Sequence, residues 1–292
     1  MRFTAGFVAC LILCQIMVGC SQDPSAVNSS NTDQDAATAS IQGGDALLDW
    51  QAASITLPID HYGMSLDEEL LVDAAGSLEF ARCIQQTDKY DAGAVAEAVR
   101  YIGSVPMYHH WRFGWWNANY VAQYGPYGIE DLPLQYMLGG ASEEDIRTCF
   151  DDFRSKGFLG LTSGGIDEIG LPLTLGDGQS MELTAVDPAF LALRDEWRQC
   201  INQAGYLTYG QESDWSAVVI DYDWSQELIS LAALEEAKCS DSLGYTQQVA
   251  NITASYQNEF INSHEAELVE IKRIADERVA KSVAVLKEAG VL

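Results

Sequence analysis

Basic side chains are scarce in this chain of 292 residues, which has 16 Lys and Arg against 43 Asp and Glu. The formal net charge is −27, so the field of the protein repels nucleic-acid phosphates and anionic lipids. We therefore expect no nucleic-acid partner. Excess acid is more often a source of solubility than a binding site, and we interpret it here in that way.

The chain also lacks the short motifs of several enzyme classes. It has no GxSxG turn, no P-loop, no GxGxxG sequence and no HExxH sequence. Histidine occurs only at His61, His109, His110 and His264, and neighbouring imidazoles point apart on a helix or strand, so they rarely bind one metal ion. We predict no catalytic residue, no metal site and no cofactor.

An apolar leader opens the chain. Arg2 is followed by an uncharged and mostly apolar run up to Cys20, which predicts an export signal peptide over residues 1–19. Met17-Val18-Gly19 before Cys20 follows the pattern of a bacterial lipobox. Cleavage there leaves Cys20 as a diacylated amino terminus, and two acyl chains are enough for stable anchoring in the membrane. The alternatives are an uncleaved membrane anchor and an ordinary secretory signal.

Residues 20–45 are rich in Ser, Asn, Asp, Ala and Gln and show no apolar periodicity. Such a segment cannot bury enough surface to offset its ordering entropy, so it is predicted to be a flexible tether. The folded part is expected over residues 46–292, at the extracytoplasmic face of the cell membrane. Removal of the signal takes away Arg2 and no acidic residue, so the mature chain carries a net charge of −28.

Capping signals and helical periodicity predict a mainly α fold with a long helical hairpin at its carboxyl end. One short β-hairpin is expected around Gly176-Asp177-Gly178, where apolar residues alternate. The expected helices run from a capping box at Ser65 and Glu68 to about Thr87, over Ala92–Ile102, from Ser142 to near Gly157, from Asp187 to Gly205, over Gln226–Leu243 and over Gln247–Ala289.

The last of these helices is predicted to span about 60 Å at 1.5 Å per residue. Its apolar stripe includes Phe260, His264 and Leu268, so we interpret His264 as a hydrogen-bonded residue at the boundary of the core rather than as a ligand.

Four cysteines fall in the folded part: Cys83, Cys149, Cys200 and Cys239. An even number in an exported chain predicts two disulfides, with three possible connectivities; free buried thiols are the alternative. Cys200 and Cys239 each precede a Gly-Tyr pair by about one helical turn, so the two helix ends are alike and are expected to lie side by side. This similarity favours Cys200–Cys239, which leaves Cys83–Cys149.

Residues 108–128 hold eight aromatic rings. Trp111, Trp115 and Trp116, with Arg112, are candidates for a ligand-binding face, because aromatic rings stack on sugars. The competing interpretation is wrapping of the core, since Trp116, Tyr120 and Tyr124 are four residues apart and share one face of a short helix. We favour the core.

Carboxylate pairs are the remaining source of chemistry. Asp221 and Asp223 share one face of an extended run, where they can hold Ca²⁺ or act in hydrolysis. We favour a structural role in which Asp223 caps the next helix. The adjacent pairs are interpreted as solvated faces: Asp151-Asp152, Asp167-Glu168 and Glu235-Glu236.

Several landmarks, in their order, resemble a group of actinobacterial lipoproteins and secreted proteins of unsettled function. The resemblance covers most of the mature chain and implies the same address and architecture, but no reaction. The group tends to have a Gly-Gly-Cys loop where this chain has Cys149 in an expected helix. The landmarks are Leu57-Pro58-Ile59-Asp60 with Tyr62, Arg82-Cys83-Ile84, Tyr124-Gly125-Pro126-Tyr127-Gly128, Trp197-Arg198-Gln199-Cys200 with Gly205-Tyr206, and Ala233 to Leu243 with Lys238-Cys239.

The sequence thus favours a non-enzymatic lipoprotein whose partner is an envelope glycan or protein. Two alternatives stay open. One is a cell-envelope hydrolase that uses carboxylates, and the other is the substrate-binding lipoprotein of a transporter. The regular strand-helix alternation of a two-lobed receptor is missing from the sequence, which disfavours the second.

Overall fold

The computed structural model describes residues 45–83, 96, 99–100, 113–126, 142–158, 169–208, 218, 221 and 223–292. The chain divides into two units, Met1–Ile41 and Gln42–Leu292, and every described residue belongs to the second. The expected signal peptide, the expected tether up to residue 44 and most of the helix expected over Ala92–Ile102 lie outside the described residues. Within the described ranges, no helix combines the length and the apolar character needed to cross a membrane.

Helices dominate the described part of the chain, so the predicted mainly α fold is confirmed. A small antiparallel sheet pairs β1 (Leu47–Asp49) with β2 (Ser54–Thr56). The described helices are the short 3-10 helix η1 (Pro58–Tyr62) and the α-helices α1 (Leu66–Cys83), α3 (Ala118–Tyr124), α4 (Glu143–Ser155), α5 (Leu171–Val186), α6 (Pro188–Gln203), α7 (Gln226–Leu243) and α8 (Tyr245–Glu288).

Local capping sets three of the helix starts as predicted. At α1 the Glu68 carboxylate accepts from the backbone N–H of Ser65 at 2.7 Å, and the Ser65 hydroxyl accepts from the N–H of Glu68 at 3.3 Å, which completes a capping box. Ser142 caps α4 by accepting from the N–H of Asp145. Asp187 caps α6, which has Pro188 in its first turn, where the missing proline N–H costs nothing.

The prediction of a β-hairpin around Gly176-Asp177-Gly178 is wrong, because this segment belongs to the helix α5. The hydroxyls of Ser180 and Thr184 donate to carbonyls one turn back, at 2.6 and 2.8 Å. α5 packs on α8 along much of its length, so burial against α8 overrides the alternating local pattern. The small sheet that does form, β1 with β2, lies near the start of the described chain.

The cap expected at Asp223 is also wrong. Ser225 caps α7 and accepts from the N–H of Leu228. Asp221 instead accepts from the N–H of Asp223 at 3.0 Å, so this carboxylate closes a turn just before the helix.

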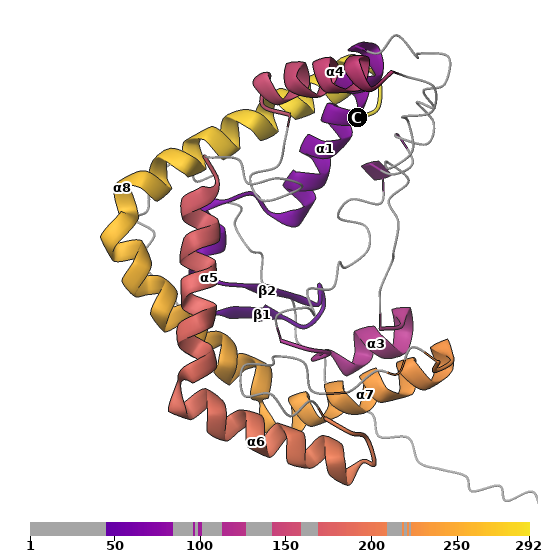
Figure 1. Cartoon of the computed structure of the whole chain (residues 1–292), viewed down its shortest axis with the longest axis vertical. Helices are drawn as coiled ribbons and strands as arrows, with labels where there is room; N and C mark the ends of the chain where they lie inside the picture. The colour runs from indigo at the N-terminus through magenta and orange to yellow at the C-terminus, as the bar shows by residue number, and fades with distance from the viewer. Residues whose placement is uncertain are drawn as a thin grey trace, which may run out of the picture. The chain divides into compact units, whose positions relative to one another are not determined.

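α8 is long, as predicted, and it is bent (Figure 1). It has 44 residues, and His264 within it has non-helical angles, φ −127° and ψ 15°. Nδ1 of the half-buried His264 lies 2.9 Å from the carbonyl oxygen of Phe260, and the two rings stack at 4.0 Å. A side chain that contacts a carbonyl of the helical ladder is a recognised cause of a kink. The expected role of His264 at the core boundary agrees with these contacts.

Most other elements pack on α8. α5, α1, η1, α6 and α7 all contact it, and η1 and α5 contact each other. α7 meets α8 at Gly244, which adopts the left-handed conformation at φ 58°. The expected hairpin of α7 and α8 is therefore present near this junction, while much of α8 packs on α5, α1 and η1.

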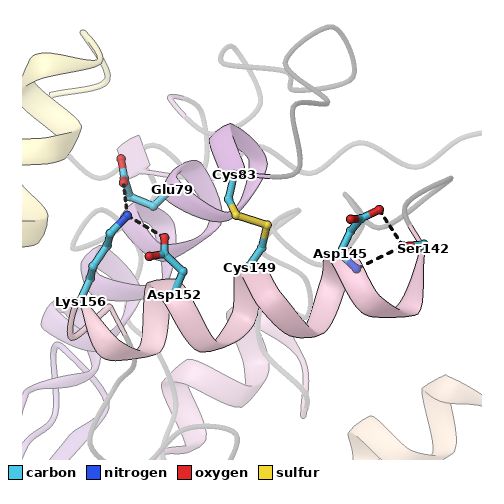
Figure 2. The surroundings of a disulfide bond; sticks show 7 residues. All are labelled: Glu79, Cys83, Ser142, Asp145, Cys149, Asp152 and Lys156. Carbon is cyan, nitrogen blue, oxygen red and sulfur yellow. Dashed lines mark hydrogen bonds and ion pairs between the residues drawn. A yellow bond between two sulfur atoms is a disulfide. The ribbon is translucent and has the colours of Figure 1, made fainter.

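Two disulfides join helices at separate places. Cys200 of α6 bonds Cys239 of α7, with their Cα atoms 5.8 Å apart. Cys83 at the end of α1 bonds Cys149 in the middle of α4, with Cα atoms 5.7 Å apart (Figure 2). Both bonds confirm the pairing predicted from the similar helix ends at Cys200 and Cys239.

Candidate functional site

The aromatic segment is the strongest functional candidate of the sequence, and the structure describes its residues 113–126. Trp111 and Arg112, together with His109 and His110, lie outside the described residues. Trp116 is fully buried and Phe113 is almost so, at 0% and 3% exposure. Both belong to the core cluster that α6, α7 and the first half of α8 build. The described rings therefore support the wrapping of a core.

The short helix in this segment differs from the expected one. Asn117 caps α3 by accepting from the N–H of Tyr120 at 3.0 Å, so Trp116 precedes the helix instead of lying on it. Tyr120 and Tyr124 do share a face, with ring centroids 4.8 Å apart. Gly125 ends the helix at φ 82°.

Three described rings of this region keep some access to solvent: Trp115, Tyr124 and Trp50. Trp115 is half-buried, and its indole N–H donates to the carbonyl of Pro126 at 2.9 Å. Trp50, in the turn between β1 and β2, is 47% exposed and meets Trp116 edge-on at 5.0 Å. The Asn117 amide donates to the Trp50 carbonyl at 2.9 Å, so the cap of α3 also holds this turn. Trp50 was not among the residues predicted for this site, because Trp50 lies about 60 residues before the aromatic segment that it contacts.

Beneath the aromatic segment lies the carboxylate of Glu236. This residue is 1% exposed, so the expectation that the Glu235-Glu236 pair is a solvated face is wrong for Glu236. Its Oε1 accepts from the backbone N–H of Trp115 at 3.0 Å, and its Oε2 accepts from the N–H of Val218 at 3.1 Å. One buried side chain of α7 thereby holds two distant parts of the chain.

Gly114 leaves room for the Glu236 carboxylate to reach the backbone of the aromatic segment. It has φ +68°, and a Cβ atom added there would lie 2.1 Å from Oε1 of Glu236 and 3.0 Å from the Trp197 ring. Only glycine fits such a position without a displacement, because it has neither the steric penalty at positive φ nor a Cβ.

Tyr245 and Arg194 are further buried polar groups of this region. The Tyr245 ring stacks on Trp197 at 4.2 Å. Burial, and then the charge of Glu236, raise the pKa of Tyr245 above its ordinary value, although Arg194 acts in the opposite direction. Arg194 is 4% exposed and sits over the Phe190 ring at 5.7 Å. Tyr245 therefore stays protonated at neutral pH.

The spacing along α7 contained the signal for Glu236. The buried positions of this helix follow a helical spacing of three or four residues, and Glu236 is one of them: Ile229, Ala232, Ala233, Glu236, Ala237, Cys239 and Ser240. A carboxylate on such a stripe is buried even when the adjacent residue in the sequence faces solvent. Arg194 is found in the same way, on the α6 stripe with Phe190, Trp197 and Ile201.

The carboxylates proposed for hydrolysis or for Ca²⁺ do not form a cluster with other ligands. Asp221 and Asp223 are exposed, and Asp221 accepts from the Asp223 backbone. Among the described residues, no group of three or more His, Cys, Asp and Glu is arranged to hold a metal ion. His61 is exposed on η1.

Comparisons with models of protein families, with curated proteins and with solved structures find no match to this chain.

Proposed function

We propose that the protein is a non-enzymatic lipoprotein of the cell envelope, anchored through Cys20 and displayed outside the cytoplasm. The apolar leader up to Cys20 and the resemblance to actinobacterial lipoproteins support this address. The single observation that carries the proposal from the structure is the pair of disulfides, Cys83–Cys149 and Cys200–Cys239. Disulfides persist in exported proteins and are rare in reducing compartments, so all four cysteines of the folded part agree with export.

Charge supports a role at a surface rather than on nucleic acid. The mature chain has a net charge of −28. This charge keeps a tethered protein soluble and repels it from anionic lipid headgroups. The partner that we propose is an envelope glycan or protein.

The use of carboxylates favours binding over catalysis. Glu236, Glu68 and Asp187 all accept from backbone N–H groups, which is how carboxylates brace loops and helix ends. The exposed Trp50 ring, which meets Trp116 edge-on, offers an apolar face for a partner.

Metabolic labelling tests the anchor. The full chain is expressed in a host with lipoprotein processing, fed with labelled palmitate and compared with Cys20→Ser. The matched control is Cys14→Ser, which removes a cysteine of the leader and keeps Cys20. We expect label on the wild type and on the control, and none on Cys20→Ser. Equal labelling of all three, or a mature protein that retains Met1, contradicts the proposal.

The alternatives have tests of their own. Asp221→Asn and Asp223→Asn are assayed against cell-wall glycans, and loss of turnover with an intact fold would favour the hydrolase. A thermal-shift screen with small solutes addresses the transporter lipoprotein, since a ligand that binds only the native state raises the unfolding temperature.

A further inference from the structure

The helix α4 is attached to the rest of the protein by few buried groups. Among the α4 side chains whose burial the structure describes, Cys149 is the only buried one, at 4% exposure, and Ile146 is half-buried. Both contribute to the cluster of α1, α4 and the end of α8. α1 is the main packing partner of α4, and the Cys83–Cys149 bond joins these two helices directly (Figure 2).

Polar contacts add little to this attachment. Lys156, just after α4, lies 3.9 Å from Glu79 of α1 and 2.7 Å from Asp152 of α4 itself, and these surface pairs contribute weakly. α4 holds five acidic and two basic residues, a net charge of −3, in a chain that is strongly acidic as a whole. Long-range repulsion therefore favours release of the helix.

The residues after α4 are held more firmly. Phe158 is 2% exposed in the same cluster, with the Lys281 ammonium 4.8 Å from its ring centroid. Lys281 also donates to the carbonyl of Lys156 at 2.5 Å. The carboxyl end of α4 is thus fixed on α8, whereas, among the described contacts, the rest of the helix is joined to α1 mainly through the disulfide and the half-buried Ile146.

The other disulfide has a different setting. Cys200–Cys239 joins α6 and α7, whose own side chains are buried in the largest core cluster. Phe190, Trp197 and Ile201 of α6 are all 0% exposed. Packing keeps these two helices together with or without the bond.

From this contrast we infer that the Cys83–Cys149 bond is a redox-sensitive clasp, and that its reduction releases α4 from α1 while the remaining helices stay packed. The release uncovers apolar side chains of α1 and α8, including Phe80 and Leu286. This inference goes beyond the proposed function and is independent of the lipid anchor.

The reductant is a dithiol. Its thiolate attacks Cys83, the half-buried member of the pair, and forms a mixed disulfide, while the Cys149 sulfur leaves as a thiolate and takes up a proton. The second thiol of the reductant then attacks its own sulfur in the mixed disulfide, and Cys83 leaves as a thiol. Two cysteine thiols and one cyclic disulfide are the products, so two electrons pass from the dithiol to the protein.

Hydrogen exchange measured by mass spectrometry tests the clasp on the full chain. In Cys83→Ser/Cys149→Ser we expect amides of residues 143–152 to exchange about tenfold faster or more, and those of α5 to α8 to stay within about twofold of the wild type. The matched control, Cys200→Ser/Cys239→Ser, leaves exchange in α4 unchanged. Protection of α4 equal to that of the oxidised wild type overturns the inference, and so does an equal loss of protection in every helix.

A second measurement applies if the variants do not fold. The oxidised wild type is titrated with dithiothreitol and alkylated, and the labelled cysteines are identified by mass spectrometry. We expect Cys83 and Cys149 to be alkylated at lower reductant than Cys200 and Cys239, because packing holds the latter pair in place to re-form its bond. The reverse order, or simultaneous alkylation of all four, overturns the clasp.

Discussion

Glu236 shows how much one buried side chain can organise. Its two oxygens accept from Trp115 and Val218, which are 121 and 18 residues away along the chain, and Gly114 leaves it the space to do so. Hydrogen bonds to a buried charged group contribute more than neutral ones, and a partner left unsatisfied costs its full desolvation energy. The aromatic segment is therefore positioned by one carboxylate.

We predict that Glu236→Gln lowers the free energy of unfolding by about 2–3 kcal/mol. The glutamine side chain has no charge, and its NH₂ group would face one of the two backbone N–H groups in place of an acceptor oxygen. Urea denaturation followed by circular dichroism measures this change. Glu235→Gln is the control, since the Glu235 side chain is 35% exposed and pairs with Lys238 at the surface. A similar loss in both variants would contradict the anchoring role.

Two aspartates have pKa values shifted in opposite directions. Burial raises the pKa of Asp73 on α1 above its ordinary 3.8. A hydrogen bond from the Tyr256 hydroxyl, at 2.7 Å, lowers the pKa of Asp187. The charged form is thus disfavoured by folding at Asp73 and favoured at Asp187.

We predict that Asp73→Asn is more stable than the wild type at neutral pH. In the wild type, the cost of the buried charge grows as the pH rises through the folded-state pKa of Asp73, and it is absent below the unfolded value of about 3.8. The difference in urea midpoint between the variant and the wild type should therefore vanish at low pH. Persistence of the full difference under acid conditions would assign the effect to packing.

Tyr256→Phe gives a comparison of opposite sign. It removes the main cause of the lowered Asp187 pKa, so we expect the variant to be less stable than the wild type at neutral pH. The deficit should narrow as the pH falls below about 3.8 and through the folded-state pKa of Asp187.

At the scale of elements, α5 shows two glycines with different roles in one helix. A Cβ atom on Gly176 would lie 2.5 Å from the Phe260 ring and 2.6 Å from Ile59, whereas one on Gly178 would meet nothing within 4 Å. Gly176 therefore sets the close approach of α5 to α8 and η1, and Gly178 only lowers the helix propensity.

We predict that Gly176→Ala destabilises the protein by about 1–2 kcal/mol, since overpacking outweighs the gain in helix propensity. Gly178→Ala should stabilise it by about 0.5–1 kcal/mol, because alanine loses less backbone entropy in a helix. Thermal and urea unfolding of the two variants measure both effects. Equal changes of the same sign would show that the approach of α5 to α8 is not tight at Gly176.

At the scale of the whole molecule, charge opposes compactness. The chain has 43 acidic and 16 basic residues. The ion pairs in the described part of the chain lie mostly within single helices, such as those of Arg273 with Glu270 and Glu277. Such pairs stabilise a helix locally and compensate little of the overall repulsion.

We predict that the unfolding temperature rises when NaCl is increased from about 0.02 to about 0.2 M, because salt screens repulsion among exposed charges. Differential scanning calorimetry of the full chain measures this change. A variant with Arg273→Gln should show the same increase, since it removes only local pairs. A fall of the unfolding temperature with salt would mean that attractive pairs outweigh the net charge.

The sequence by itself determined the features that depend on neighbours a few residues apart. Ser65 with Glu68, Ser142 and Asp187 set helix starts through contacts within three residues, and the similar ends at Cys200 and Cys239 indicated the disulfide pairing. Only the tertiary structure decided that α5 is a helix, that α8 bends at His264 and that Trp50 meets Trp116. These features follow from surfaces brought together from distant parts of the chain, and packing of that kind overrides local pattern because its burial energy exceeds the small differences in local propensity.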